Sequence, residues 1–396
     1  MPVLAITLGN CCPRCKPSHQ AVSPGETRKR DGNRLKQIPM PTIHHQRADK
    51  SATDPDLSIK EFMRRSGLVG TASRFQFHRL TGGVSSDIWL ISTGSESLCV
   101  KRALPQLRVA ADWHAPVQRN TFESAWFRTV GAFMPESVPK ILYEEQDRAM
   151  FAMEYLPPDK YENWKQMLAH GIVHPETAAD IGTRLARIHS VTAQSKILPR
   201  QFETDAIFHA IRIEPYLLAT ARAHPEIAAK LNALAERTER TKLALVHGDV
   251  SPKNILIGPA APVFIDAECA WFGDPAFDLC FCLNHLLLKC IMAPASTGEF
   301  LNAFRLMSRA YLREVGWEDP QEFQERAASL LPGLLLARVD GKSPVEYVNT
   351  DQQRSLVRQI ALKLLENSPK QLSFIADAWA RALGYASSGD GNECAY

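Results

Sequence analysis

The sequence predicts an α+β protein of two lobes, in which a small antiparallel sheet with one helix against it precedes a mostly helical lobe. Strand-like alternation of apolar and polar residues is concentrated before residue 156, and helical spacing prevails after residue 157. With 396 residues, the chain is also too long for one comfortable hydrophobic core. These observations place the first lobe at residues 56–156 and the second at residues 157–386.

The first lobe is predicted to contain five strands, with a helix between the third and the fourth. A short helix at residues 58–65 precedes the sheet, and residues 93–96 form the turn between its second and third strands. The strands are expected at residues 74–80, 87–92, 97–102, 141–144 and 151–155, and the helix at residues 120–130.

The second lobe begins after a break at residues 156–159, where two prolines interrupt regular structure as a hinge would. Ile181, Leu185 and Ile188 then share one face of a helix. Further helices are expected at residues 205–221, 225–238, 275–292, 300–315, 320–331, 352–366 and 369–383. The exception is a short β insert at residues 255–257 and 263–265.

The two ends of the chain read as tails. Residues 1–55 are rich in Pro, Gly, Ser, Lys and Arg and lack hydrophobic periodicity, so they are predicted to be disordered. Residues 387–396 are expected to be flexible. The first ten residues lack the basic start and the cleavage site of a signal peptide.

Composition argues against several classes of protein. The net charge of +3 is not concentrated on a folded segment, so no nucleic-acid partner is expected. Nine cysteines, an odd number, make a disulfide framework improbable and favour a reducing cytoplasm. The most apolar stretch, residues 276–292, contains Asp278 and Lys289, which favours a core helix over a membrane span. The oligomeric state is not predicted.

Three polar residues surround the β insert within residues 245–268, LVHGDVSPKNILIGPAAPVFIDAE. Asp249 and Asn254 precede its first strand, and Asp266 follows its second. Phosphoryl transfer needs Mg²⁺ between phosphates, an oriented hydroxyl and charge neutralisation. Asp266 and Asn254 offer the oxygen ligands that Mg²⁺ prefers, which leaves Asp249 to accept the hydroxyl proton or to orient the hydroxyl. Each residue alone has an ordinary role as a turn former or strand-end cap, but the combination favours phosphoryl transfer.

These residues carry a resemblance to a known family. The string from His247 to Asp249, followed by Asn254 and Asp266, resembles the aminoglycoside phosphotransferase and choline kinase group of small-molecule kinases, over about residues 57–385. The resemblance implies a protein-kinase-like fold, ATP as co-substrate, Asp249 as catalytic base, and Asn254 and Asp266 as Mg²⁺ ligands. It also implies that Asp278 braces the catalytic loop from the start of a helix.

A glycine-containing turn in the first lobe is the candidate phosphate-binding loop. Gly82, Gly83 and Ser85 lie between two expected strands, where backbone amides can approach phosphates closely. A glycine pair alone is more often a hairpin turn. Its position ahead of the strand pair that ends at Lys101 favours a nucleotide site.

The resemblance implies three more nucleotide contacts. Lys101 stands where the family has its ATP-phosphate lysine, and Glu123 on the following helix is the candidate partner of Lys101. Glu136, in a proline-flanked loop, is the alternative partner. Glu154 and Tyr155 fit the hinge segment whose backbone would meet adenine.

The connection after the β insert favours a small acceptor. Asp278 follows Asp266 by only twelve positions, too few for the activation segment of a protein kinase. Gly248 stands where protein kinases usually carry an arginine. Two alternatives stay open: an atypical protein kinase, and a catalytically weak, pseudokinase-like binding protein.

Part of the chain looks like methylthioribose kinase, notably residues 100–105 and the pair Asp266 and Glu268, although Asn254 departs from that pattern. The similarity makes Glu268 a second carboxylate beside the metal; a solvated turn acid is the alternative. We expect a neutral acceptor such as a sugar or sugar thioether. Arg338 and Asp340 either face the cleft, where they would bind substrate or product phosphate, or form a helix-end turn.

Overall fold

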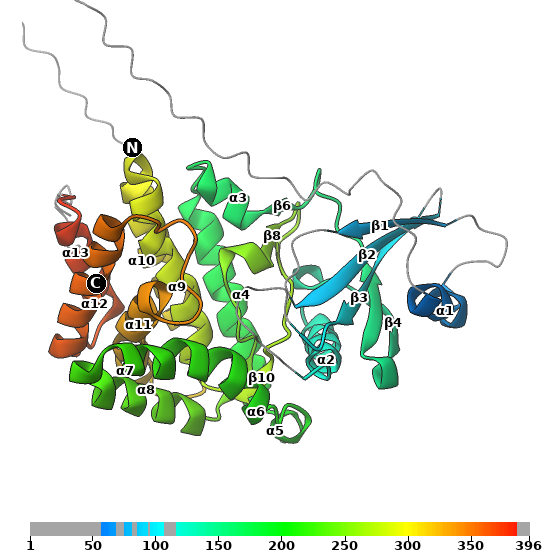
Figure 1. Ribbon diagram of the computed structural model, residues 1–396, viewed down its shortest axis with the longest axis horizontal. Helices are drawn as coiled ribbons and strands as arrows, with labels where there is room; N and C mark the ends of the chain where they lie inside the picture. The colour runs from blue at the N-terminus through cyan, green and yellow to red at the C-terminus, as the bar shows by residue number, and fades with distance from the viewer. Residues whose placement is uncertain (1–56, 69–74, 81–84, 94–95, 107–115, 386–396) are drawn as a thin grey trace, which may run out of the picture. The chain divides into compact units, whose positions relative to one another are not determined.

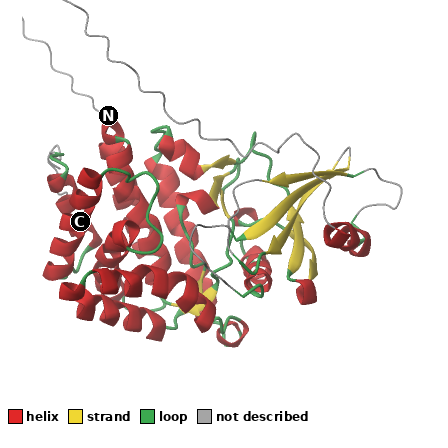
Figure 2. Ribbon diagram, in the orientation of Figure 1, coloured by secondary structure: helices red, strands yellow, loops and turns green. Residues whose placement is uncertain are grey.

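The computed structural model describes residues 57–68, 75–80, 85–93, 96–106 and 116–385, all within one unit that spans residues 46–396. The predicted tails, residues 1–55 and 387–396, lie outside the described residues, and the predicted lobe boundaries stay predictions. Figures 1 and 2 show a sheet with few helices in the first part of the chain and a mostly helical second part. The α+β architecture expected from the sequence is confirmed.

The first part is a five-stranded antiparallel sheet with the order β1-β2-β3-β5-β4. Every predicted strand is present, within about two residues of its expected ends. The strands are β1 (Gln76–Leu80), β2 (Ser86–Thr93), β3 (Glu96–Ala103), β4 (Ile141–Glu145) and β5 (Met150–Glu154), and the helices are α1 (Leu57–Ser66) and α2 (Arg119–Gly131).

Alternation along β3 gives the sheet two different faces. Val100 belongs to a cluster with Phe62 of α1 and Trp89 of β2. Successive strand residues point to opposite faces, so the neighbouring Lys101 points to the face that α2 covers. Its register partner Phe151 packs there in the larger core. Because side chains alternate between the two faces of a strand, Lys101 points toward α2 and the larger core.

The second part is built around α9 (Pro275–Met292), whose ends match the prediction. This helix is long and apolar enough to cross a membrane, but 94% of it is buried inside the protein, as a core helix would be. The other helices include α3 (Trp164–Ala169), α4 (Pro175–Ala193), α5 (Leu198–Gln201), α6 (Asp205–Phe208), α7 (Ala219–Ala223), α8 (Ala228–Arg240), α10 (Thr297–Arg313), α11 (Pro320–Asp340), α12 (Asp351–Asn367) and α13 (Leu372–Ala382).

Two helical segments depart from the regular pattern expected. The helix predicted at residues 205–221 contains a π-helical stretch, His209–Leu218, with Pro215 inside it. The helix predicted to end at residue 331 continues through Pro332 to Asp340. An internal proline removes one helical hydrogen bond. Residues 334–337 are nevertheless fully buried in the core, and their burial stabilises the continued helix.

Short strands frame the predicted catalytic segment. β7 (Ala244–Val246) pairs with β10 (Trp271–Gly273), and β8 (Ile255–Ile257) pairs with both β6 (Glu162–Asn163) and β9 (Pro262–Phe264). The predicted β insert is therefore confirmed. It leaves Asp249 and Asn254 between β7 and β8, and Asp266 just beyond β9.

Burial of the segment beyond Pro332 gives a direct test of the corrected helix end. We expect Leu335→Ala to lower the free energy of unfolding by about 2–5 kcal/mol, because it leaves a cavity in the core. Glu322→Ala, at an exposed position of the same helix, should change it by less than about 0.5 kcal/mol. Urea denaturation measures both. A cost at Leu335 no larger than at Glu322 would contradict the packed position of this segment.

Candidate active site

The carboxylate of Asp278 holds the loop after β7 in place. Asp278, in the first turn of α9 and fully buried, accepts hydrogen bonds from the backbone N–H groups of His247 (2.7 Å) and Gly248 (2.8 Å). His189 of α4 adds a third contact at 3.3 Å. The brace implied by the family resemblance is therefore present, and it fixes the backbone immediately before Asp249.

His247 joins the loop to the segment after β9. Its Nδ1 accepts the backbone N–H of Asp249 at 3.1 Å, so Nε2 carries the proton and donates to the carbonyl of Ile265, also at 3.1 Å. Burial lowers the pKa of His247, which keeps the ring neutral in this one tautomer. The residue is a structural link between Asp249 and Asp266.

Gly248 is required by geometry. Its φ is +76°, and an added Cβ would lie 2.5 Å from the carbonyl oxygen of Cys269 and 2.7 Å from its Cβ. A residue with a side chain would therefore meet both backbone strain and a clash. The absence of the arginine found in protein kinases thus has a positive structural reason here.

Asp249 is buried between two cations. Its carboxylate lies 3.0 Å from Nη2 of Arg212 and 3.1 Å from Nζ of Lys253. Burial alone would raise the pKa of Asp249, but the charges of Lys253 and Arg212 hold it below its ordinary value. Asp249 is therefore ionised at neutral pH, and it is better suited to orient a hydroxyl group than to remove a proton early.

Arg212 is a site residue that the sequence reasoning missed. It lies in the π-helical stretch, donates from Nε to the carbonyl of Gly248, and is nearly buried. The two residues are 36 positions apart, so no local motif connects them. The available signal was an arginine in a mostly apolar helical run.

A backbone hydrogen bond across the β insert joins Asn254 to the residue before Asp266. The amide nitrogen of Asn254 donates to the carbonyl of Asp249 at 3.1 Å, which leaves its amide oxygen for a cation. Its own carbonyl accepts the backbone N–H of Ile265 at 3.0 Å. Asp266 follows with a φ of +64°, a left-handed conformation that non-glycine residues rarely adopt and that often marks functional sites.

Lys101 connects the sheet to Asp266. The ammonium group is buried, lies 2.7 and 2.8 Å from the two carboxylate oxygens of Glu123, and contacts the carboxylate of Asp266. Burial would lower the pKa of Lys101, but Asp266 and Glu123 hold it above its ordinary value. Glu136, the alternative partner, instead pairs with Arg184 at 2.8 Å. The structure thus favours Glu123.

Arg119 is the second residue that sequence reasoning missed. Its buried guanidinium donates to the carboxylate of Glu268 (3.1 Å) and to the carbonyl oxygens of Ser85 (2.5 Å) and Leu104 (2.7 Å). It therefore ties the start of β2 to the segment after β9. The metal role expected of Glu268 stays a prediction, since its carboxylate is engaged by Arg119.

The remaining predicted nucleotide contacts are Gly82, Gly83, Ser85, Glu154 and Tyr155. Gly82 and Gly83 lie outside the described residues. Ser85 is buried just before β2, Glu154 is exposed at the end of β5, and Tyr155 is partly buried after it. Their contacts with nucleotide stay predictions.

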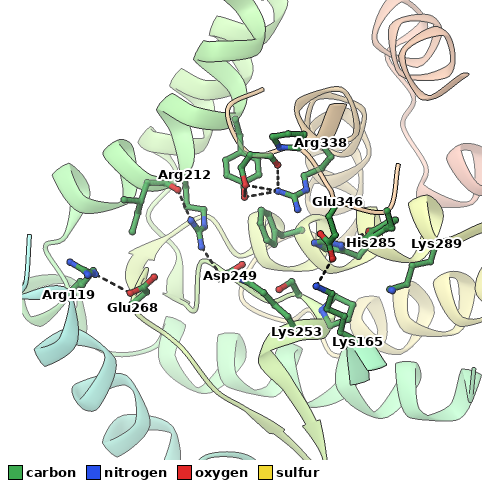
Figure 3. Close-up of a pocket in the computed structure, with 18 residues that line it drawn as sticks. Arg119, Lys165, Arg212, Asp249, Lys253, Glu268, His285, Lys289, Arg338 and Glu346 are labelled. Carbon is green, nitrogen blue, oxygen red and sulfur yellow. Dashed lines mark hydrogen bonds and ion pairs between the residues drawn. The ribbon is translucent and has the colours of Figure 1, made fainter. Parts of the chain in front are cut away.

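A cavity of about 250 Å³ opens beside Asp249. Figure 3 shows Arg212, Lys253 and Arg338 around it, from the π-helical stretch, the segment between β7 and β8, and α11. Arg338 lines this cavity, whereas Asp340 pairs with Arg358 and His224 away from it. Of the two alternatives predicted for this pair, Arg338 fits the first, because it lines the cavity. Asp340 fits the second, because it stabilises the helix end.

The donors at the site fit Mg²⁺. Among the residues that the structure describes, no three His, Cys, Asp or Glu side chains gather as a preformed metal site. Mg²⁺ is usually held by one or two carboxylates together with substrate phosphates and water. Asp266 with the amide oxygen of Asn254 fits that pattern.

A buried lysine paired with a helix glutamate, an aspartate beyond a strand and a second aspartate beside a cavity form the charge arrangement that phosphoryl transfer requires. The site thus has the features of a phosphotransferase.

Comparison with known proteins agrees with this class. Residues 76–289, more than half of the chain, match the model of the phosphotransferase enzyme family. The chain belongs to this family.

Two curated relatives are methylthioribose kinases. The protein from Erwinia tasmaniensis is 27% identical over 229 residues, which cover 51% of this chain and 57% of the relative. The protein from Bacillus thuringiensis is 22% identical over 265 residues, which cover 60% and 66%. The chain therefore spans less than two thirds of the length of these relatives.

Similar solved structures include two kinase complexes. The streptomycin–ATP ternary complex of APH(2'')-IIa has a TM-score of 0.45 and 15% identity, over 79% of this chain and 99% of the other. The complex of amicoumacin kinase hAmiN with AMP-PNP, Ca²⁺ and Ami has a TM-score of 0.48 and 13% identity, over 80% and 95%.

The contact between Gly248 and Cys269 can be tested against a matched glycine. Gly384 has a similar φ of +68° but open space where its Cβ would be. We expect Gly384→Ala to cost about 1 kcal/mol, from the left-handed backbone alone. Gly248→Ala should cost clearly more, because it adds a clash with backbone atoms. Equal losses in the free energy of unfolding, measured by urea denaturation, would contradict the close approach.

Proposed function

We propose that this protein is an ATP-dependent kinase that transfers the γ-phosphoryl group to a hydroxyl of a small molecule, such as a sugar or sugar thioether. The observation that carries the proposal is the contact between Lys101 and Asp266, which are 165 positions apart, next to Asp249 and its cavity. It brings a phosphate-neutralising cation, a metal-side carboxylate and a hydroxyl-orienting carboxylate into one site. The methylthioribose kinase relatives support the sugar thioether class.

In this mechanism the nucleotide phosphates would bind near Lys101 and, as expected from the sequence, near the amides of Gly82 and Gly83. Asp266 and Asn254 would hold Mg²⁺, with Glu268 as a further carboxylate, and Mg²⁺ when bound would neutralise charge on the transferring phosphoryl group. The acceptor hydroxyl would lie in the cavity beside Asp249.

Asp249 orients the hydroxyl and receives its proton. The acceptor oxygen bonds to the γ-phosphorus while the bond from that phosphorus to the bridging oxygen of ADP breaks. The transition state is loose, so the hydroxyl proton leaves late. A carboxylate with a lowered pKa suits this role, because Arg212 and Lys253 keep it ionised until transfer. The proton then passes to solvent.

A reducing compartment suits the cysteines that the structure describes. Cys99, Cys269, Cys280, Cys282 and Cys290 are all free and buried. A cytoplasmic location, as expected from the sequence, is part of the proposal.

Loss of the Asp249 carboxylate separates chemistry from nucleotide binding. We expect Asp249→Asn to lower the rate of ATP consumption with pooled hydroxylated metabolites by about 10²–10⁴-fold. The affinity for Mg–ATP should stay within about threefold, because the proposed metal ligands remain. Nucleotide consumption measures the rate, and calorimetric titration measures the affinity.

Two outcomes would contradict the proposed function. If no metabolite pool gives wild-type consumption above that of Asp249→Asn, the pseudokinase-like alternative gains. If phosphate appears on protein instead of in the small-molecule fraction, the atypical protein kinase alternative gains.

Asp266→Asn tests the proposed metal role. We expect the affinity for Mg–ATP to fall by about tenfold or more, because a neutral amide is a weaker Mg²⁺ ligand than a carboxylate. The affinity for ATP with Mg²⁺ chelated should change much less. Titration in both conditions measures the difference, and an unchanged Mg–ATP affinity would remove Asp266 from this role.

A further inference from the structure

The cavity beside Asp249 has an excess of positive charge. Its lining includes six Lys and Arg side chains but only three carboxylates. Each of these carboxylates already has a cationic partner. Asp249 pairs with Arg212 and Lys253, Glu268 with Arg119, and Glu346 with Lys165. Among the described residues, Lys289 and Arg338 line the cavity without a carboxylate partner.

Lys289 is the unusual member of this pair. Its side chain is only 1% exposed, and its nearest polar contact among the described residues is the sulfur of Met292, at 4.0 Å. The ammonium group lies over the ring of Tyr347, 4.9 Å from its centroid. A buried charge normally has a partner of opposite sign. The last turn of α9 favours a cation through its dipole, yet no carbonyl of that turn accepts a hydrogen bond from Lys289 Nζ.

Arg338 is also incompletely satisfied. Its Nη1 donates to the hydroxyl groups of Tyr216 (3.0 Å) and Ser343 (3.1 Å), while its buried Nε has no partner among the described residues. All its hydrogen-bond partners are neutral. The side chain is therefore held in place, but no described carboxylate forms an ion pair with it.

His285 also lines the cavity, and the positive charges of Lys289 and Arg338 act on its imidazole. Its Nδ1 is hydrogen-bonded to the Tyr347 hydroxyl at 2.8 Å. Burial, together with the charges of Arg338, Lys289, Lys253 and Lys165, lowers the pKa of His285 well below its ordinary value. The four cations that act on this imidazole all line the same cavity.

Resting on the proposed kinase function, we infer that the acceptor carries an oxyanion, a carboxylate or a phosphate, which binds near Lys289, His285 and Arg338 while its hydroxyl meets Asp249. Figure 3 shows Asp249 and Lys289 apart within the group of lining residues, with His285 between them. The inferred acceptor is therefore elongated. This narrows the proposed acceptor to an acidic hydroxylated molecule, and it departs from the neutral sugar or sugar thioether that the sequence and the methylthioribose kinase relatives favour. It also disfavours a polycation, because the same charges would repel it.

The test uses pairs of hydroxylated probes that differ in charge. Gluconate is compared with sorbitol, and glycerol 3-phosphate with glycerol, by calorimetric titration into the full chain with Mg–AMP-PNP present. Inorganic phosphate is a third anion. We expect at least one organic anion to bind tenfold or more tightly than its neutral partner, with an affinity that falls as salt rises. The carboxylate and phosphate pairs distinguish the two kinds of oxyanion.

Lys289→Gln supplies the matched test of the site. It should weaken anion binding by about tenfold, the order of effect of losing one charge-assisted contact, and leave the neutral probes unaffected. Lys289→Met gives a second variant that removes the charge and keeps an apolar stem in the core. Lys363→Gln, at an exposed position on α12, should behave as the wild type. Mg–AMP-PNP binding, measured on every variant, reports that each is folded.

Several results would overturn the inference: no anion binding, equal binding of anion and neutral partner, or anion binding by both Lys289 variants as in the wild type. These readouts need no turnover. Anion binding at Lys289 without phosphoryl transfer to any acceptor would refute the proposed function and leave the anion site. Transfer to neutral sugars without anion binding would refute the anion site and leave the proposed function.

Discussion

The Asp278 carboxylate holds the segment from which the site is built. It is fully buried in the first turn of α9, where the helix dipole favours a negative charge, and it accepts two consecutive backbone N–H groups of the loop before Asp249. A buried carboxylate is costly unless its oxygens are hydrogen-bonded. The loop, α4 and α9 therefore constrain one another, and the position of Asp249 depends on α9, a helix that is 94% buried.

Two further side chains, His247 and Arg212, connect this loop to neighbouring segments of the site. His247 extends it to the backbone before Asp266, and Arg212 closes it from the π-helical stretch. Lys101 and Arg119 then join the segment after β9 to the sheet. The site is thus a chain of buried polar contacts, each satisfied by the next. In such networks the loss of one member leaves its partner unsatisfied, so single substitutions carry large effects.

Sequence reasoning recovered what local patterns encode. The strands followed from alternation, α9 from its apolar run, and Asp249, Asn254 and Asp266 from their spacing around two short strands. Arg212 and Arg119 were missed because their partners are 36 and 149 positions away. The end of α11 was placed too early because Pro332 is a local stop signal, and burial of the residues after it overrides that signal. The charge of the cavity could not be anticipated, since its lining comes from several separate elements.

The contact between Lys101 and Asp266 has a consequence for how nucleotide would enter. Two carboxylates, Glu123 and Asp266, already share one ammonium group, which is buried together with Glu123. If Mg²⁺ and phosphates bind as proposed, Asp266 exchanges an organic cation for a metal ion, and Lys101 exchanges a carboxylate for a phosphate. Asp266 and Lys101 would each have a partner of opposite charge both before and after binding, so binding would replace one ion pair with two new ones. The ion pairs within the site therefore hold these side chains in place before any substrate binds.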